Sequence, residues 1–177
     1  MKKLILAASV LILASAANAQ QASKSNARNV YGEIGFHRAQ LEVADGFNAT
    51  HNLVTGIVGY QFHPNLSAEL LLGAGMGSQT DNVGPLEVNT KIDNTFALML
   101  RPSWRFNEKL EGFVRLGYGR TKASVDGMSG SASSPVLGVG VNWYFTPELY
   151  GQLSYTSFHN KDEVKAEGVG VSIGYKF

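Results

Sequence analysis

Four times in this chain an aromatic residue stands two places before a phenylalanine. Residues two apart on a β-strand point to the same face, so each pair predicts two neighbouring rings on one face of a strand. Three of the pairs run into short polar turns, and after each turn a leucine opens a new alternating run. The rings should therefore lie at one end of a set of strands, as an aromatic girdle at a lipid–water boundary requires. The pairs are Tyr60/Phe62, Trp104/Phe106, Trp143/Phe145 and Tyr175/Phe177.

From Val30 onward the chain divides into eight runs of alternating apolar and polar residues, which predict strands. Their approximate bounds are 30–43, 52–62, 66–78, 92–106, 110–122, 135–145, 149–159 and 166–177. Three connections are short turns, at 63–65, 107–109 and 146–148, and the others are longer, at 44–51, 79–91, 123–134 and 160–165. Alternating short and long connections are typical of an up-and-down barrel in an outer membrane. The predicted fold class is all-β, an eight-stranded antiparallel up-and-down transmembrane β-barrel over residues 30–177.

The two faces of these runs differ sharply in character. One face carries aliphatic and aromatic residues without a charge in its central stretches, and the other is polar and small and holds every mid-strand charge. A soluble lipocalin-type barrel would turn the apolar face inward around a ligand. However, an eight-stranded barrel has an interior just wide enough for side chains, and a soluble exterior would carry more lysine and glutamate. We therefore expect the apolar face to meet lipid.

The short turn at 107–109 predicts the register of its hairpin. If Phe106 faces Leu110, then Arg105 lies opposite Glu111, and Arg101 lies opposite Arg115. Two opposed arginines destabilise a strand pair and are costly in a narrow lumen unless acids lie close by.

Two inward acids are available near the same end, Glu33 and Glu69. We hypothesise that they bridge Arg101 and Arg115 in a polar core that plugs the lumen. The core would serve as a structural network or, alternatively, as a gate whose re-pairing opens a narrow pore. The predicted lumen charge network consists of Glu33, Glu69, Arg101, Arg105, Glu111 and Arg115.

The N-terminal residues predict a secretory signal. Met1-Lys2-Lys3 precedes a short apolar run and Ala17-Asn18-Ala19, so we expect residues 1–19 to be removed after Ala19 and residues 20–29 to form a flexible lead-in. The remaining chain has 13 basic and 14 acidic residues, which indicates no nucleic-acid partner. There is no cysteine, and the four histidines are scattered, so we predict no metal site and no cofactor.

With these features the chain resembles the small eight-stranded outer-membrane proteins, the OmpA/OmpX-like barrel superfamily. The resemblance rests on the signal ending Ala-Asn-Ala, the eight runs and the terminal Gly-Tyr-Lys-Phe, and it covers about residues 30–177. It implies recognition of the C-terminal strand, ending in Phe177, by the barrel assembly machinery. OmpA proteins proper continue into a periplasmic peptidoglycan-binding domain, and the resemblance does not extend to that activity.

Some small outer-membrane barrels modify lipid A, and the candidate residues for such chemistry are Ser157, His159 and Glu163. A nucleophilic serine needs a histidine within hydrogen-bond reach and a third group to orient it. The lipid A deacylase family reads His-x-Ser-Asn, whereas this chain has Phe158-His159-Asn160-Lys161 and departs at the serine. We therefore rank a lipid-modifying enzyme well behind the other functions.

The function expected from the sequence is a non-enzymatic integral outer-membrane protein with a structural role in the cell envelope. Its surface loops would be available for adhesion or interaction, and the alternative function is a narrow gated pore for ions or small solutes. Both termini should be periplasmic, and the protein should be monomeric. The expected partners are outer-membrane lipid, lipopolysaccharide and the barrel assembly machinery.

Overall fold

The computed structural model describes residues 29–43, 47–77, 79–83, 86–125, 128–158 and 164–177. The predicted signal at 1–19 and nearly all of the lead-in therefore lie outside the described residues. The described part of the chain contains no helix with the length and apolar character needed to cross a bilayer.

The described residues are almost entirely strand, because polar and apolar residues alternate along them. The strands are β1 Val30–Val43, β2 Phe47–His63, β3 Leu66–Gly75, β4 Gln79–Val83, β5 Leu86–Arg105, β6 Leu110–Val125, β7 Met128–Tyr144, β8 Leu149–Phe158 and β9 Val164–Lys176.

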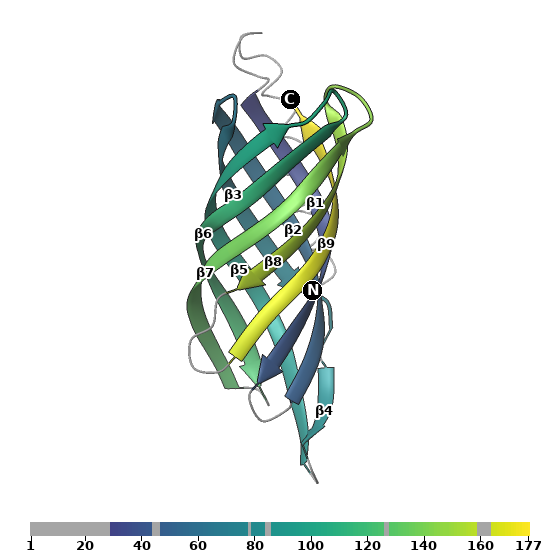
Figure 1. Ribbon diagram of the computed structural model, residues 1–177. Helices are drawn as coiled ribbons and strands as arrows, with labels where there is room; N and C mark the ends of the chain where they lie inside the picture. Colours follow the sequence, from purple (N-terminus) through teal and green to yellow (C-terminus); the bar gives the residue numbers. More distant parts are fainter. Residues whose placement is uncertain (1–28, 44–46, 78, 84–85, 126–127, 159–163) are drawn as a thin grey trace, which may run out of the picture.

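The strands form one closed antiparallel barrel. Apart from β3 and β4, which do not pair with each other, each strand pairs with its sequence neighbours, and β1 also pairs with β9, for example Ile34 with Ile173. Pairing of β3 with β5 completes the wall. Strongly tilted ribbons in Figure 1 wrap around a common axis, with the short turns and the C-terminus at one end. The predicted eight-stranded antiparallel barrel is thus confirmed.

Nine strand segments occupy eight positions in the barrel because β3 and β4 share one. Both pair with β5, and the register changes by one residue between Gly73↔Thr95 and Gln79↔Thr90. Gly77 lies in the break with φ of 86°, a left-handed conformation that glycine adopts without steric cost. The third barrel strand is therefore interrupted toward the end opposite the short turns.

The prediction for the longer connections is wrong, because strands occupy most of them. The strand β2 begins at Phe47, inside the predicted connection 44–51. The strand β7 contains nearly all of a Gly/Ser-rich tract at 127–134, which belongs to the predicted connection 123–134. Beyond the lipid boundary both faces of a hairpin meet water, so the alternating pattern disappears although backbone pairing continues. The barrel wall therefore extends past the apolar zone as paired hairpins, which form the end opposite the short turns (Figure 1).

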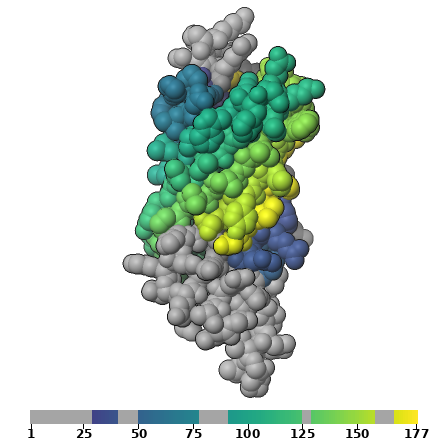
Figure 2. Space-filling model, viewed as in Figure 1, coloured from purple at the N-terminus to yellow at the C-terminus, as the bar shows by residue number. Residues whose placement is uncertain are grey.

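The apolar face points outward, as the sequence predicts. Ile34, Leu98 and Tyr118 are each about 60% exposed, whereas the charged residues Glu69 and Arg101 are 2% exposed. Figure 2 shows the outward side chains of successive strands as tilted bands from teal to yellow along the barrel. An apolar exterior around a charged interior excludes the lipocalin-type arrangement and defines a wall that faces lipid.

Candidate functional site

A layer of charged side chains crosses the lumen near the short-turn end, and we call it the lumen charge layer. The β5–β6 register pairs Arg105 with Glu111 and Leu100 with Leu116, as predicted, which sets Arg101 opposite Arg115. Glu69 comes from β3 and Glu33 from β1. The layer consists of Glu33, Glu69, Arg101, Glu111 and Arg115, with Arg105 at its edge.

Arg115 is the best-connected member of the layer. Its Nε donates to Glu69 Oε2 at 2.6 Å, and its Nη2 donates to Glu33 Oε2 at 2.7 Å. Its Nη1 donates to Gln152 Oε1 at 2.9 Å. Every nitrogen of this buried guanidinium is therefore hydrogen-bonded, and both ion pairs oppose the large cost of burying the charge.

Arg101 is held less completely. Its Nη2 donates to Glu111 Oε1 at 2.8 Å, whereas its Nε lies 3.6 Å from Glu69 Oε1 and has no hydrogen-bond partner. The Phe113 ring contacts both arginines, with its centroid 4.4 Å from Arg101 Cζ and 4.6 Å from Arg115 Cζ. The ring and the carboxylates together allow two opposed cations to share one narrow lumen.

Arg105 lies at the short-turn edge of the layer and is only loosely attached to it. Its side chain is 52% exposed, and its Nη2 lies 3.8 Å from Glu111 Oε2. The guanidinium also stands 4.8 Å from the centroid of the Tyr144 ring. An exposed pair at this distance contributes little to stability.

Three tyrosines complete the layer, and the sequence analysis missed them. Tyr31 and Tyr150 are buried, and each donates its hydroxyl to a carboxylate of the layer. The sequence does contain a signal for them, because Tyr31 lies two residues before Glu33 and Tyr150 lies two residues before Gln152. Residues two apart on a strand share a face, so both tyrosines should point inward. The hydroxyl bonds are Tyr31 to Glu69 Oε1 at 2.7 Å, Tyr150 to Glu33 Oε1 at 2.8 Å and Tyr144 to Glu111 Oε2 at 3.2 Å.

Glycines on facing strands make room for these rings. Tyr31 pairs with Gly59, and a Cβ on that glycine would lie 2.1 Å from Tyr31 Cζ. Tyr150 pairs with Gly174, where the corresponding distance is 2.2 Å. Gly59 and Gly174 on the inner face therefore leave the space that the rings of Tyr31 and Tyr150 fill.

The prediction of a polar and small inner face is incomplete, because apolar side chains also face the lumen. Just beyond the lumen charge layer lies a buried apolar cluster of Ile57, Leu71, Ala97, Met99 and Val136, which we call the lumen apolar layer. A narrow barrel interior must be filled by side chains, and apolar ones fill it at lower desolvation cost. The sequence conceals this layer, because residues such as Leu71 have apolar neighbours on both sides. A second apolar cluster farther out consists of Ala39, Leu53 and Ile92.

The rings of the predicted aromatic girdle point outward, and their residues lie beside the short turns and at the C-terminus. Three of its phenylalanines cover glycines of neighbouring segments, as Phe106 does with Gly112, where a Cβ would lie 2.8 Å from the ring. Tyr175 and Phe177 meet edge to face with centroids 5.3 Å apart. Seven members are 44 to 66% exposed and Phe177 is half-buried: Tyr60, Phe62, Trp104, Phe106, Trp143, Phe145, Tyr175 and Phe177.

The catalytic candidates are not assembled within the described residues. Ser157 lies on β8 with intermediate exposure, while His159 and Glu163 lie outside the described residues. Within the described part of the chain, no group of three or more His, Asp or Glu side chains is placed to hold a metal ion.

A closed antiparallel barrel with an apolar exterior and a charged, filled interior defines the small transmembrane β-barrels. The chain matches the family model of the outer membrane protein beta-barrel domain over residues 8–177. The protein therefore belongs to this family, and it is an integral outer-membrane barrel.

Solved structures of small outer-membrane barrels are similar to this chain. One is Ail, the attachment invasion locus protein of Yersinia pestis, whose structure was solved in complex with the heparin analogue sucrose octasulfate. Its sequence is 20% identical to this chain, and the two structures align with a TM-score of 0.63 over 84% of this chain and 97% of Ail. Neisserial surface protein A is 14% identical with a TM-score of 0.64 and the same coverages. OprG of Pseudomonas aeruginosa is 11% identical with a TM-score of 0.61, covering 86% and 97%. At these identities the likeness shows the fold alone, and no curated protein sequence is significantly similar to the chain.

Proposed function

We propose that the protein is a non-enzymatic structural barrel of the cell envelope with a closed lumen, whose outer hairpins are available for adhesion or interaction. The observation that carries this proposal is the double barrier in the lumen. The lumen charge layer is paired across the barrel, and the lumen apolar layer fills the space directly beyond it. An ion crossing this interior would have to displace paired charges and then pass a constriction lined by apolar side chains.

Planar-bilayer recording of the refolded protein tests the closed lumen. We expect no conductance steps from the wild type, and none from Glu69→Ala or Arg101→Ala, because Leu71 and Met99 still occlude the lumen. The unheated proteins should retain the faster gel mobility of a folded barrel. That result would exclude misfolding as the reason for the absence of conductance steps. Steady open steps in the wild type would overturn the proposal.

A gated pore is the second candidate, and the geometry of Arg101 favours it. Its Nε lacks a hydrogen-bond partner while Glu69 lies 3.6 Å away, so exchange of Arg101 between Glu111 and Glu69 needs little movement. A gate predicts that Glu69→Ala and Arg101→Ala change the open probability. If both variants leave conductance at baseline, the gate fails and the closed barrel stands.

We propose that the short turns and both termini face the periplasm. Support comes from the backbone hydrogen bond of Phe177 N to Val30 O at 2.9 Å, which brings the first and last strands together at the short-turn end. The strands extend farthest at the other end, as hairpins that would stand outside the cell. The Ala132→Cys variant should react with an impermeant maleimide on intact cells, because Ala132 is exposed on the outer hairpin, whereas Asn107→Cys should react only after lysis. The reverse pattern would show the opposite orientation.

We also propose that the barrel assembly machinery recognises β9 and its terminal Phe177, and that the folded protein is monomeric. Support comes from the outward apolar series on β9, in which Val169, Val171 and Ile173 are exposed to lipid. Phe177→Ala should slow assembly in cells, measured as the fraction with heat-modifiable mobility, while refolding of the purified variant is little changed.

A further inference from the structure

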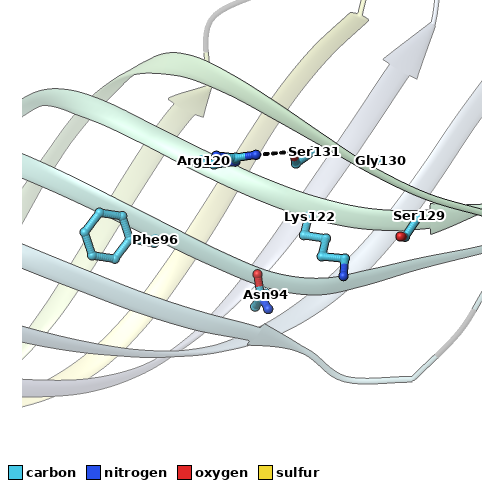
Figure 3. A pocket seen from close by; sticks show the side chains of 7 residues that line it. All are labelled: Asn94, Phe96, Arg120, Lys122, Ser129, Gly130 and Ser131. Atoms are coloured by element: carbon cyan, nitrogen blue, oxygen red, sulfur yellow. Dashed lines mark hydrogen bonds between the residues drawn. The ribbon is translucent and has the colours of Figure 1, made fainter.

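The outer wall of the barrel contains a hollow that the lumen does not explain. It has a volume of about 480 Å³ and lies over β5, β6 and β7. Figure 3 shows Arg120 and Lys122 of β6 between Asn94 and Phe96 of β5 and the serines of β7. These residues face away from the lumen, because Arg120 and Lys122 share strand parity with the exposed Leu116 and Tyr118.

The hollow lies where the apolar wall ends. On β6 the outward series passes from Tyr118 directly to Arg120. On β5, Phe96 pairs with Arg120 and the next outward residue is Asn94, which pairs with Lys122. On β7 the outward residues at this level are serines. Three adjacent strands thus change from apolar to polar at one level, which marks the outer lipid–water boundary.

The two cations of the hollow have no anionic partner within the part of the chain whose side chains are described. Arg120 Nη2 donates to Ser131 Oγ at 2.7 Å, a neutral acceptor (Figure 3). The nearby acid Asp93 is already engaged, because Ser124 Oγ donates to it at 2.6 Å and Lys91 pairs with it at 3.7 Å. Two like charges on one strand face repel each other, and an anion between them would remove that repulsion.

We propose that this hollow binds a phosphate group of lipopolysaccharide in the outer leaflet. A guanidinium fork and an ammonium group suit phosphate oxygens, and hydroxyls of Ser129 and Ser131 can donate further hydrogen bonds. The apolar wall below, formed in part by Phe96, suits the acyl chains that hang directly beneath such a phosphate. A soluble polyanion would have no use for this apolar surface. The proposal rests on the proposed orientation, in which the hairpin end is outside.

The test is affinity for lipopolysaccharide in the full-length barrel, refolded into phosphatidylcholine nanodiscs and titrated with fluorescently labelled diphosphoryl lipid A. Arg120→Gln and Lys122→Gln should each weaken binding about fivefold, and the double variant about twentyfold. Lipid A without phosphate should bind the wild type as weakly as diphosphoryl lipid A binds the double variant. Arg38→Gln is the matched control, because Arg38 is the first outward cation beyond the apolar residues of β1.

Equal affinity of the wild type and the double variant, or an equal loss in Arg38→Gln, would overturn the site. Heparin and inorganic phosphate are the competing ligands. If either displaces the lipid at concentrations comparable to those of lipid A, the site is a general anion site and the lipid proposal is wrong. Maleimide labelling of Ala132→Cys, which does not line the hollow, distinguishes failure of this site from failure of the proposed orientation. Labelling with unchanged affinity overturns this site alone, whereas labelling only after lysis overturns the orientation on which it rests.

Discussion

Arg115 and Arg120 lie on the same strand, β6, and meet opposite environments. Arg115 points into the lumen, is 2% exposed and is held by Glu33, Glu69 and Gln152. Arg120 points outward at the edge of the apolar wall and donates to one serine hydroxyl. Strand parity gives the two side chains opposite directions, and five residues along β6 place Arg120 at the edge of the apolar wall. A buried arginine needs carboxylates of the same protein to offset the cost of burying its charge. The charge of an arginine at the lipid–water boundary remains available to a ligand.

The largest effect is expected from removing the buried arginine. Arg115→Met should lower the free energy of unfolding by about 3–5 kcal/mol, because Glu33 and Glu69 remain buried beside an apolar side chain. Urea unfolding in lipid vesicles, followed by tryptophan fluorescence and heat-modifiable gel mobility, measures this change. A loss below about 1 kcal/mol would show that water already reaches the layer.

A smaller loss is expected when one acid of the layer is neutralised. Glu69→Gln should cost about 2–3 kcal/mol, because the amide keeps the shape but loses the charge that faces both arginines. Combined with Arg115→Met, it should cost clearly less than the sum of the single changes, since the two residues share one network. Additive losses in this double-mutant cycle would contradict direct coupling of Glu69 and Arg115.

Removing one hydroxyl tests whether the missed tyrosines belong to the layer. Tyr31→Phe should lower the unfolding free energy by about 1.5 kcal/mol, because it deletes a hydrogen bond to a buried carboxylate. The matched control is Tyr118→Phe on the lipid-facing side, which should change stability by less than about 0.5 kcal/mol. Equal effects at the two tyrosines would mean that the hydroxyl of Tyr31 is not important for the layer.

The smallest effect on stability is expected at the outer wall. Arg120→Gln should leave the unfolding free energy within about 0.5 kcal/mol of the wild type, because the exposed guanidinium has no carboxylate to leave behind. The same variant should lose affinity for lipid A. Unchanged stability with reduced binding would separate a ligand-binding arginine from a structural one on the same strand. A large loss of stability would instead assign Arg120 a structural role.

Much of the inner charge geometry follows from local sequence. The short turn before Leu110 predicts the β5–β6 register, and that register sets Arg101 opposite Arg115. Parity also indicates that Glu33 and Glu69 point inward. Parity does not indicate which arginine meets Glu33 or Glu69, because the contacts of these acids with Arg115 join strands far apart in the sequence. In the structure Glu33 and Glu69 both pair with Arg115, whereas Arg101 pairs with Glu111 and, at the longer distance of 3.6 Å, with Glu69.

Other features are hidden because sequence patterns become ambiguous where both faces share one polarity. Leu71 stands among leucines, so the pattern does not reveal its inward direction or its place in the lumen apolar layer. The serines of β7 resemble a loop because the hairpin outside the membrane has water on both sides. In each case backbone pairing with a neighbouring strand decides the structure, and that pairing leaves no local signature.

By itself, the sequence determined the membrane-facing exterior, the aromatic girdle and the inward placement of the charges, because period-two alternation assigns each residue to a face. Only the tertiary structure decided how the interior is closed, since the partners of Arg115 come from β1, β3 and β8, which are distant from β6 in the sequence or separated from it in the barrel. It also decided that Arg120 and Lys122 share a hollow with serines of β7, because three strands must be in register to form that surface.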